Sequence, residues 1–450
     1  MKKHSFWLMT LALLLPTLAS RAEPGASGSP ASPLKTAHLS LTETVTEALR
    51  ANPGLKALAH RTEAARRDAA AATGARWGEL NLVGNYSRLS DDQILRPLSS
   101  ELLAGGIPNL PFDREQLHYG AVYELPLYVG GRLVNQIKIT RLEAQKAELL
   151  LEGTRWQVRF NAVSLYAAAQ AIDGMRVALD GQIAALEKTH ARLDEMVSSG
   201  KRPKLDWLKA FEELAGAQAQ RANLTAERIR VAGLLLALLG RDPMGTVTVD
   251  PLPVGPAVTS AGPDDLKATL TASSSLHTAL IEAEQAERGV SSARGAFLPK
   301  VSVSANYMEN TGPTINRSLE TWGVSLGVAL PIFDGNARHQ RLASAREKRQ
   351  AAQEALTQTE LRIAAGLQEA LARLEAARTV LASAQAQVAA GGEAARIEQV
   401  RYDTGADTIE DLLRALAREQ GAKAALAAAQ AGLITAGERI NSIVEKEIYP

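Results

Sequence analysis

The chain has 450 residues, a formal net charge of +1, no cysteine and only 4% aromatic residues. A net charge so close to zero gives no electrostatic basis for binding nucleic acid. Without cysteine the chain has no disulfides, no thiolate metal site and no N-terminal cysteine to carry a lipid. Scarce aromatic residues and abundant alanine favour long, closely packed helices over a thick globular core.

Residues 1–22 have the pattern of a secretory signal peptide. A basic start precedes an apolar run from Phe6 to Leu18, and small residues offer a cleavage point after Ala22. The run is shorter than the ~20 residues of a membrane-spanning helix, so an uncleaved anchor is the less favoured alternative. Residues 23–38 are rich in Gly, Ser, Ala and Pro and predict a disordered leader.

The rest of the chain contains one pattern twice. The segment 74–86 matches 295–307 at an offset of 221 residues, and 125–128 matches 330–333 at an offset of 205. The second offset also relates three residues near the end of each half. They are Gly200, Asp206 and Leu208, which match Gly405, Asp411 and Leu413. Agreement at several landmarks indicates an internal duplication.

The duplication divides the mature chain into two structural repeats, residues 39–249 and 264–445. A linker with several prolines, residues 250–263, joins them, and residues 446–450 form a C-terminal tail. Each repeat predicts a helix, two strands, a very long helix, a tight turn and a shorter helix.

The first helix of each repeat is predicted at 42–72 and at 264–293. The strands are predicted from alternating apolar residues, the period of a β-strand. Strand by strand, these residues are Leu80, Leu82, Gly84 and Tyr86; Tyr119, Ala121, Tyr123, Leu125 and Leu127; Val301, Val303, Ala305 and Tyr307; and Trp322, Val324, Leu326, Val328 and Leu330. The small or polar opposite face fits a wet lumen, and an ordinary half-buried sheet packed on helices is the alternative.

Two helices of unusual length are predicted at 132–199 and 337–404, because no proline interrupts either segment. At 1.5 Å per residue such a helix spans ~100 Å, more than the diameter of a globular domain. Apolar residues recur at a spacing of seven, as in coiled coils. They are Ile172, Leu179, Leu186 and Leu193, and Leu367, Leu374, Leu381 and Val388. A pair of soluble antiparallel coiled coils is the alternative interpretation.

No later stretch is long and apolar enough for a transmembrane helix, so this chain would enter a membrane as strands closed into a barrel. Four strands cannot close a barrel alone, since single-chain barrels begin at about 8 strands. Exposed strand edges and the usual symmetry of oligomers therefore predict a closed ring of identical subunits. A ring of three copies is wide enough to leave a pore.

At the level of motifs, the chain resembles the TolC-type outer-membrane efflux protein family, from about Leu39 to Glu445. The residues that carry the resemblance are Asn52-Pro53 in the first helix, 125–131 and 330–335 at the strand-to-helix junctions, and 402–413 at the second turn. Two departures are Ser273 to His277 where a second Asn-Pro pair is expected, and the missing N-terminal cysteine of many relatives.

The resemblance implies a mixed α and transmembrane β fold in which a homotrimer forms a 12-stranded outer-membrane β-barrel and a periplasmic α-helical tunnel. It implies the outer membrane of a Gram-negative bacterium, with contact to outer-membrane lipid and the helical part in the periplasm. The implied partners are a periplasmic adaptor, or membrane fusion, protein and an inner-membrane pump of the RND or ABC type. The chain would then be a passive, gated exit duct in a tripartite efflux system.

The resemblance also places the two tight turns at the periplasmic tip, where an adaptor contacts the channel. The candidate contact residues are Ser199, Gly200, Lys201, Thr404, Gly405 and Ala406. The alternative is that Gly200 and Gly405 serve only as helix C-caps in the left-handed conformation.

Relatives close this tip with ion pairs and hydrogen bonds. Carried over by motif, Tyr402 and Asp206 are a candidate closing pair, and Asp411 is a candidate lumen-facing carboxylate. Arg414 stands where a second acid is expected, and Asp407 stands where a basic residue is common. The gate is therefore expected to be less acidic or of opposite polarity, unless these are ordinary solvated charges.

No residue pattern predicts an enzyme. The 7 histidines lack metal-ligand spacing, and the chain shows neither a nucleophile triad nor a phosphate loop. The sequence therefore predicts no catalytic residue, no metal and no cofactor. The competing function is a periplasmic coiled-coil adaptor or scaffold without a pore, against which the duplication and the alternating strands argue.

Overall fold

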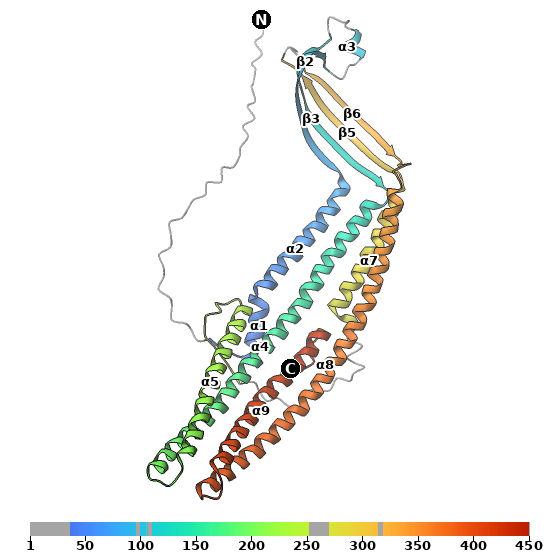
Figure 1. Ribbon diagram of the computed structural model, residues 1–450. Coiled ribbons are helices and arrows are strands. Elements are labelled where there is room, and N and C mark those ends of the chain that lie inside the picture. Colours follow the sequence, from blue (N-terminus) through green and yellow to red (C-terminus); the bar gives the residue numbers. More distant parts are fainter. Residues whose placement is uncertain are drawn as a thin grey trace.

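The computed structural model describes residues 37–95, 100–104, 106, 110–251, 270–313 and 318–449. In the first repeat the elements are β1 (Ala37–Leu39), α1 (Leu41–Ala51), α2 (Pro53–Gly74), the 3-10 turn η1 (Ala75–Trp77), β2 (Glu79–Ile94), α3 (Ser100–Ala104), β3 (Phe112–Val129), α4 (Arg132–Ser198), α5 (Lys204–Leu238) and β4 (Val247–Val249). In the second they are η3 (Leu270–Ala272), α7 (Ser274–Gly295), β5 (Lys300–Thr311), β6 (Leu319–Ala329), α8 (Ala337–Asp403) and α9 (Ile409–Val444). The molecule is elongated, with a sheet at one end and two helical turns at the other (Figure 1).

The sheet confirms the predicted strands and joins the two repeats. Its order is β2-β3-β5-β6, every neighbouring pair is antiparallel, and the central pair β3–β5 brings Leu125 opposite Val303. Figure 1 shows the sheet continuing beyond the ends of the helices. Leu82 and Trp322 on the two outer strands are 87% and 79% exposed. The sheet is therefore not packed on helices, and the alternative of an ordinary half-buried sheet is wrong.

The long helices are as predicted. The helices α4 and α8 have 67 residues each, begin at Arg132 and Ala337, and end one residue before the predicted limits. Leu179, Leu186 and Leu193 of the heptad series are at most 1% exposed, because they face the neighbouring helices. Within the described residues, none of the helices combines the length and the apolar character needed to cross a membrane.

The helices form a curved layer with α7 and α9 lying end to end between α4 and α8. Toward the sheet the order across the layer is α2, α4, α7, α8, and toward the turns it is α5, α4, α9, α8. Each row therefore has two outer helices that lack a neighbour on one side within the chain.

The predicted first helix is in fact two helices. α1 ends at Ala51 because Pro53 has no backbone N–H and the side chain of Asn52 accepts a hydrogen bond from Leu55 N at 3.0 Å. The Asn52 amide also donates to the Leu238 carbonyl at the end of α5. The Asn-Pro pair is thus a corner that fixes α1 to a distant helix.

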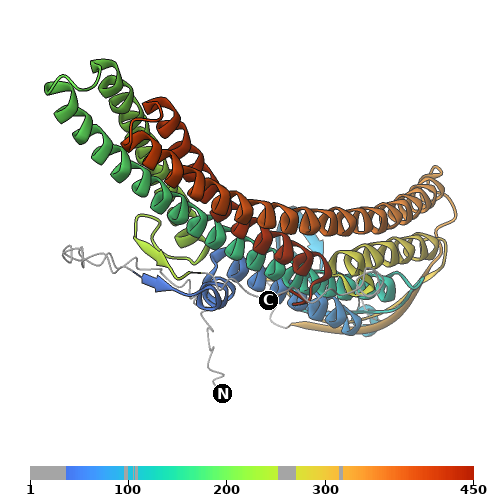
Figure 2. The same ribbon diagram turned by 90° about the horizontal axis from the view of Figure 1, so that it is seen from below.

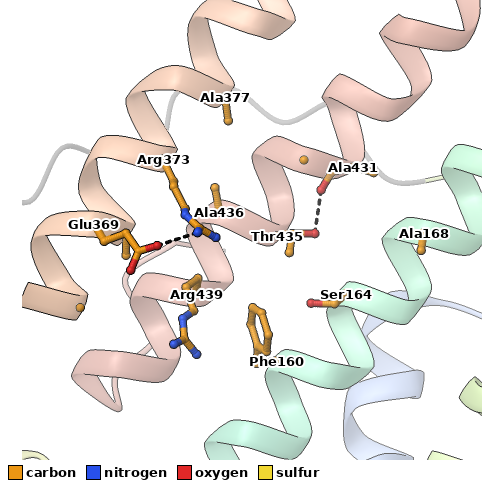
Figure 3. A pocket seen from close by; sticks show the side chains of 13 residues that line it. Phe160, Ser164, Ala168, Glu369, Arg373, Ala377, Ala431, Thr435, Ala436 and Arg439 are labelled. Carbon is orange, nitrogen blue, oxygen red and sulfur yellow. Dashed lines mark hydrogen bonds and ion pairs between the residues drawn. The ribbon is translucent and has the colours of Figure 1, made fainter. Parts of the chain in front are cut away.

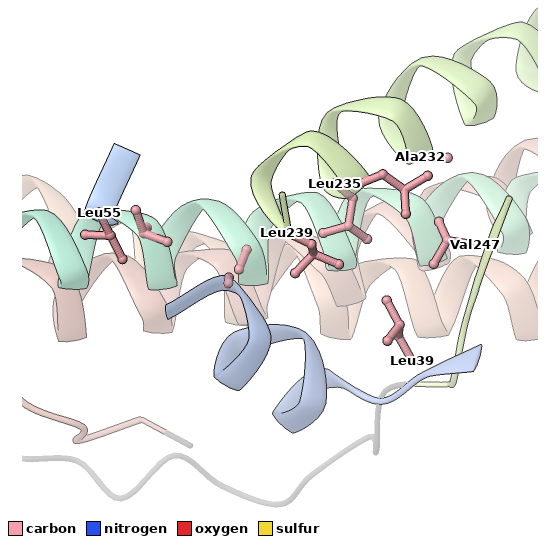
Figure 4. Packing of buried hydrophobic residues seen from close by; sticks show 10 residues of the cluster. Leu39, Leu55, Ala232, Leu235, Leu239 and Val247 are labelled. Atoms are coloured by element: carbon pink, nitrogen blue, oxygen red, sulfur yellow. The ribbon is translucent and has the colours of Figure 1, made fainter. Parts of the chain in front are cut away.

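A small β–α unit covers the middle of the helical layer. β1 pairs in parallel with β4, so Ala37 and His38, expected in the leader, belong to a strand. The Tyr166 hydroxyl of α4 lies within hydrogen-bonding distance of the carbonyl oxygens of Leu39 (3.0 Å) and Asp250 (2.8 Å). Figure 4 shows the underlying cluster of buried residues, which includes Leu39, Leu55, Ala232, Leu235, Leu239 and Val247. Viewed from below, the blue β1 and α1 lie on the outer side of the molecule's bend (Figure 2).

The second repeat differs from expectation at both ends. Of the helix predicted at 264–293, residues 264–269 lie outside the described residues. The described helix α7 begins at Ser274, whose backbone N–H donates to the Glu445 carboxylate at 3.0 Å. The predicted tail is packed, since the Asn441 side chain, fully buried, bonds the backbone of Ile448 and Tyr449. The signal peptide, residues 23–36 of the leader and most of the linker lie outside the described residues.

Candidate functional site

The two helical turns have the same geometry at the same end of the molecule. Gly200 and Gly405 have φ angles of +72° and +78°, and a Cβ on either would meet no atom within 4 Å. After each glycine the chain closes back on its helix: Lys201 N donates to Met196 O, and the equivalent bond follows Gly405, both at 2.8 Å. The helix C-cap role of both glycines is confirmed.

The same turns present a surface. All six residues predicted to contact an adaptor are exposed, namely Ser199, Gly200, Lys201, Thr404, Gly405 and Ala406. The capping role and the exposure are compatible, because the glycine conformation directs the flanking side chains outward.

The candidate closing pair is linked through a third residue. Tyr402 is 5% exposed, yet its hydroxyl has no hydrogen-bond partner among the described residues. The Arg202 guanidinium lies 4.9 Å from the centre of the Tyr402 ring, and its Nη1 lies 3.9 Å from Asp206 Oδ2. Burial raises the pKa of the Tyr402 phenol above its usual value. Arg202 therefore joins the α4–α5 turn to the end of α8.

Sequence reasoning missed Arg202. A signal was present, because Arg202 precedes Asp206 by four residues at the start of a helix, a spacing that allows an ion pair. Its contact with Tyr402 joins residues that lie 200 positions apart, and no local pattern indicates such a contact.

Asp407 lies in a compact charged group at the second turn. Arg401 reaches Asp407 with Nη2 at 3.2 Å and Glu398 with Nη1 at 3.5 Å. The Thr408 backbone N–H, which donates to Asp407 at 2.9 Å, lowers the pKa of that carboxyl. Interaction with the neighbouring Asp407 carboxyl raises the pKa of Glu398. The pKa values of the two carboxyls are therefore shifted in opposite directions.

Asp411 contacts the N-cap residue of α9 and is half of an ion pair. Its backbone N–H donates to the Thr408 hydroxyl at 3.2 Å, which caps the start of α9. Arg414 contacts the Asp411 carboxylate at 3.3 Å and Glu410 at 2.9 Å. Arg414 thus offsets the charge that Asp411 would bring to a constriction.

The two hairpins are held together at this end of the molecule. They share one hydrophobic cluster, which contains Leu179, Leu186, Leu193, Ala210, Ala217, Tyr402, Ile409, Leu412 and Leu413. Arg192 of α4 pairs with Asp403, and Lys209 of α5 lies 3.3 Å from Glu410 of α9. The structure therefore places Asp206, Tyr402, Asp407, Asp411 and Arg414 in one region, on two hairpins bridged by cations.

In the part of the chain that the structure describes, no group of three or more His, Asp or Glu side chains is placed to hold a metal ion. The charged groups of this site pair with one another across the turns.

Comparison with known proteins agrees with the fold. Over 216 residues the chain is 27% identical to Protein CyaE of Bordetella pertussis, an alignment covering 46% of this chain and only 45% of CyaE. The outer-membrane channel OprN has a TM-score of 0.77 at 22% identity, with 91% of both chains covered. The CmeC outer membrane channel of Campylobacter jejuni has a TM-score of 0.77 at 17% identity, covering 90% of this chain and 85% of CmeC.

Both repeats match a single family description, "Outer membrane efflux protein", over residues 44–241 and 266–444. The unmatched residues between these ranges contain the linker, so the match follows the duplication. This chain belongs to the outer membrane efflux protein family.

Proposed function

We propose that the chain is one subunit of an outer-membrane channel in a tripartite efflux system. The channel gives substrates a passive, gated exit duct from the periplasm to the exterior, and it performs no catalysis. The observation that carries the proposal is the four-stranded sheet, which extends beyond the helices with apolar side chains exposed on its outer strands. Such a sheet in a member of this family is suited to closing into a barrel with further copies.

The duplication supports closure of a homotrimer. Within the chain, Gly130 at the start of α4 touches Gly295 at the end of α7, and a Cβ on either would lie 2.0 Å from the other's carbonyl oxygen. The equivalent glycines, Gly335 and Gly74, stand open with no atom within 4 Å of such a Cβ. Gly335 of one subunit would meet Gly74 of the next, which repeats the internal contact around a ring.

The bridged hairpins support a gate at the periplasmic tip. Tyr402, Arg202 and Asp206 hold the two turns together, and Asp407, Asp411 and Arg414 complete a charged network whose signs are largely balanced. Opening would separate the hairpins and break the contacts that cross between them, namely Arg202 with Tyr402, Arg192 with Asp403 and Lys209 with Glu410. The balanced charges would make the constriction only weakly selective for cations.

The exposed turns support docking of a periplasmic adaptor, with an inner-membrane pump of the RND or ABC type supplying energy and choosing the substrate. A pore-less adaptor or scaffold is the other function considered. The comparisons give it no support, because the matching family and the solved relatives are outer-membrane efflux proteins and channels.

Planar-bilayer recording tests the proposal. Protein extracted from the outer-membrane fraction and added to a lipid bilayer should produce stepwise conductance, and the purified particle in detergent should have the mass of three chains. Recovery in the soluble periplasmic fraction with no conductance would overturn the channel and restore the scaffold.

A further inference from the structure

A cavity distant from both turns lies where α4, α8 and α9 run side by side. Its volume is about 640 Å³, within the ~300–1,000 Å³ range of small-molecule sites. Most of its wall is small side chains of alanine and glycine from three helices. Figure 3 shows Phe160 and Ser164 of α4 facing Arg373 of α8 and Arg439 of α9 across this space.

The charged groups of the cavity are unequal. Arg373 is paired with Glu369 at 2.6 Å, so these two charges offset each other. Arg439 forms no ion pair with any described residue, and its guanidinium lies 5.5 Å from the centre of the Phe160 ring. The cavity therefore has one uncompensated positive charge next to an aromatic ring.

One polar atom in the wall lacks a partner. The Ser164 hydroxyl oxygen is shielded from solvent and has no hydrogen-bond partner within the chain. Because this oxygen is closed to solvent, a ligand in the cavity does not reach it, and Ser164 forms only part of the wall. The Phe160 ring and the Arg439 guanidinium lie together on this cavity.

The cavity faces away from the β1–β4 unit. Ala162 and Tyr166 of α4 pack toward that unit, whereas Phe160 and Ser164 each precede one of them by two residues. Two residues on an α-helix are ~200° apart, which puts the cavity on the opposite side of α4. The β1–β4 unit lies on the outer side of the bend (Figure 2). We infer from the helix geometry that the cavity opens toward the inner side.

We propose that this cavity binds a small organic monoanion with an aromatic body, held by Arg439 and Phe160. The anionic oxygens pair with the Arg439 guanidinium. The aromatic body lies on the alanine and glycine wall beside Phe160. Binding itself does not depend on conduction, and only the position of the site in the duct rests on the proposed channel function.

Equilibrium dialysis of the purified full-length protein in detergent tests the site. The probe is 1-naphthalenesulfonate, and the neutral 1-naphthalenesulfonamide has a nearly identical shape. We expect the anion to bind at least ~10-fold more tightly than the sulfonamide, and Arg439→Gln to remove that preference. Arg439→Lys keeps the charge and should retain part of it. Arg362→Gln removes an arginine of α8 outside the cavity and should change nothing.

A second pair of variants tests the location. Gly432 lines the cavity and Gly421 does not, and at both positions a Cβ would meet no atom within 4 Å. Gly432→Leu should therefore abolish binding of both probes without disturbing the helix, whereas Gly421→Leu should leave binding intact. Equal binding of the two probes, or unchanged anion binding in Arg439→Gln or Gly432→Leu, would overturn the site.

Bilayer recording then separates the site from the duct. If the cavity faces the lumen, 1-naphthalenesulfonate should reduce single-channel current, and Gly432→Leu should remove that block. Specific binding without block would keep the anion site and contradict its lumenal position. Absence of any conductance with binding intact would count against the channel function alone.

Discussion

Arg202 changes how the tip contacts are understood at the level of single residues. Motif comparison pairs Tyr402 with Asp206, and the structure inserts a guanidinium between them, stacked on the ring and near the carboxylate. The Tyr402 hydroxyl has no hydrogen-bond partner, so the ring rather than the hydroxyl makes the contact. Arg202 is therefore one of three cations that link the hairpins, with Arg192 and Lys209.

We expect Arg202→Gln to raise single-channel conductance by at least about twofold, because the constriction loses one of the cations that join its two hairpins. Tyr402→Phe should leave conductance unchanged, since the ring and its stacking remain. The measurement is single-channel current in planar bilayers at fixed salt. A large effect of Tyr402→Phe with none from Arg202→Gln would show that the hydroxyl, in contact with another chain, is the closing group.

Glu398 and Asp407 make the second turn sensitive to pH. Interaction with Asp407 raises the pKa of Glu398 above 4.5, and the Thr408 N–H lowers that of Asp407 below 3.8. The stabilisation from a protonated Glu398 is present at low pH and is lost as pH rises through its raised pKa. The stabilisation from charged Asp407 is lost only as pH falls through its lowered pKa. Arg401 and Asp411 are the other charged groups that act on this pair.

The α8–α9 turn should therefore be more stable at mildly acidic pH than at neutral pH. Hydrogen exchange of the backbone amides of residues 401–409, corrected for the intrinsic rate, should be slower at about pH 5 than at about pH 7. Glu398→Gln should remove this difference, and Glu354→Gln, an exposed carboxylate elsewhere on α8, should not. A difference that persists in Glu398→Gln would assign the pH dependence to other groups.

At the level of elements, the two strand-to-helix junctions, β3–α4 and β6–α8, have equivalent sequences but different surroundings. Gly130 and Gly335 are equivalent and have φ angles of +67° and +62°, a conformation that costs other residues ~1–2 kcal/mol. Only Gly130 is also crowded, since a Cβ there would lie 2.0 Å from the Gly295 carbonyl oxygen. The junction at Gly130 is packed against another helix of the chain, whereas the equivalent junction at Gly335 lies at the edge of the helical layer.

Gly130→Ala should consequently destabilise the isolated chain far more than Gly335→Ala, whose cost should stay near ~1–2 kcal/mol. The measurement is the thermal midpoint of the monomeric chain, kept from assembling by dilution, with Gly181→Ala as a control in an uncrowded helical position. If the ring forms, Gly335→Ala should also weaken subunit association, because Gly74 of the next chain would then crowd it. Equal midpoints for the two variants would contradict the role of crowding at Gly130.

For the molecule as a whole, the helical layer ends in helices that lack a neighbour on one side. Inside the chain, Gln285 of α7 bonds Glu143 of α4 at 2.9 Å. In the other repeat, the residue equivalent to Gln285 is Ala64 of α2 (offset 221) and the residue equivalent to Glu143 is Lys348 of α8 (offset 205). Both are exposed, and they lie on opposite edges of the layer. A ring would bring Ala64 of one subunit beside Lys348 of the next.

The double variant Ala64→Cys/Lys348→Cys should form disulfide-linked trimers under oxidising conditions, because the ring would bring these two positions together. The chain has no cysteine of its own, so no other disulfide competes. Non-reducing gel electrophoresis measures the product. Ala64→Cys/Arg373→Cys should not cross-link, since Arg373 lies ~37 Å further along α8. A monomeric product from the first pair would contradict the proposed ring.

The sequence alone determined the duplicated architecture, the order of the elements and the limits of α4 and α8 to within one residue. It did so because alternation, heptad spacing and positive-φ glycines are local signals that repeat in the same order. Its errors also have local causes. A single residue, Pro53, divided one predicted helix into two, and Glu445, 171 residues away, caps the helix at Ser274.

Only the tertiary structure decided which charges meet. Arg202 and Tyr402, or Arg439 and Phe160, lie hundreds of residues apart, and their contact depends on how two long helices pack side by side. A shift of one residue in that packing turns a side chain by ~100° and changes its partner. For this reason the residues of the tip were predictable from motifs, whereas the bridging role of Arg202 and the cavity at Arg439 became visible only in the folded chain.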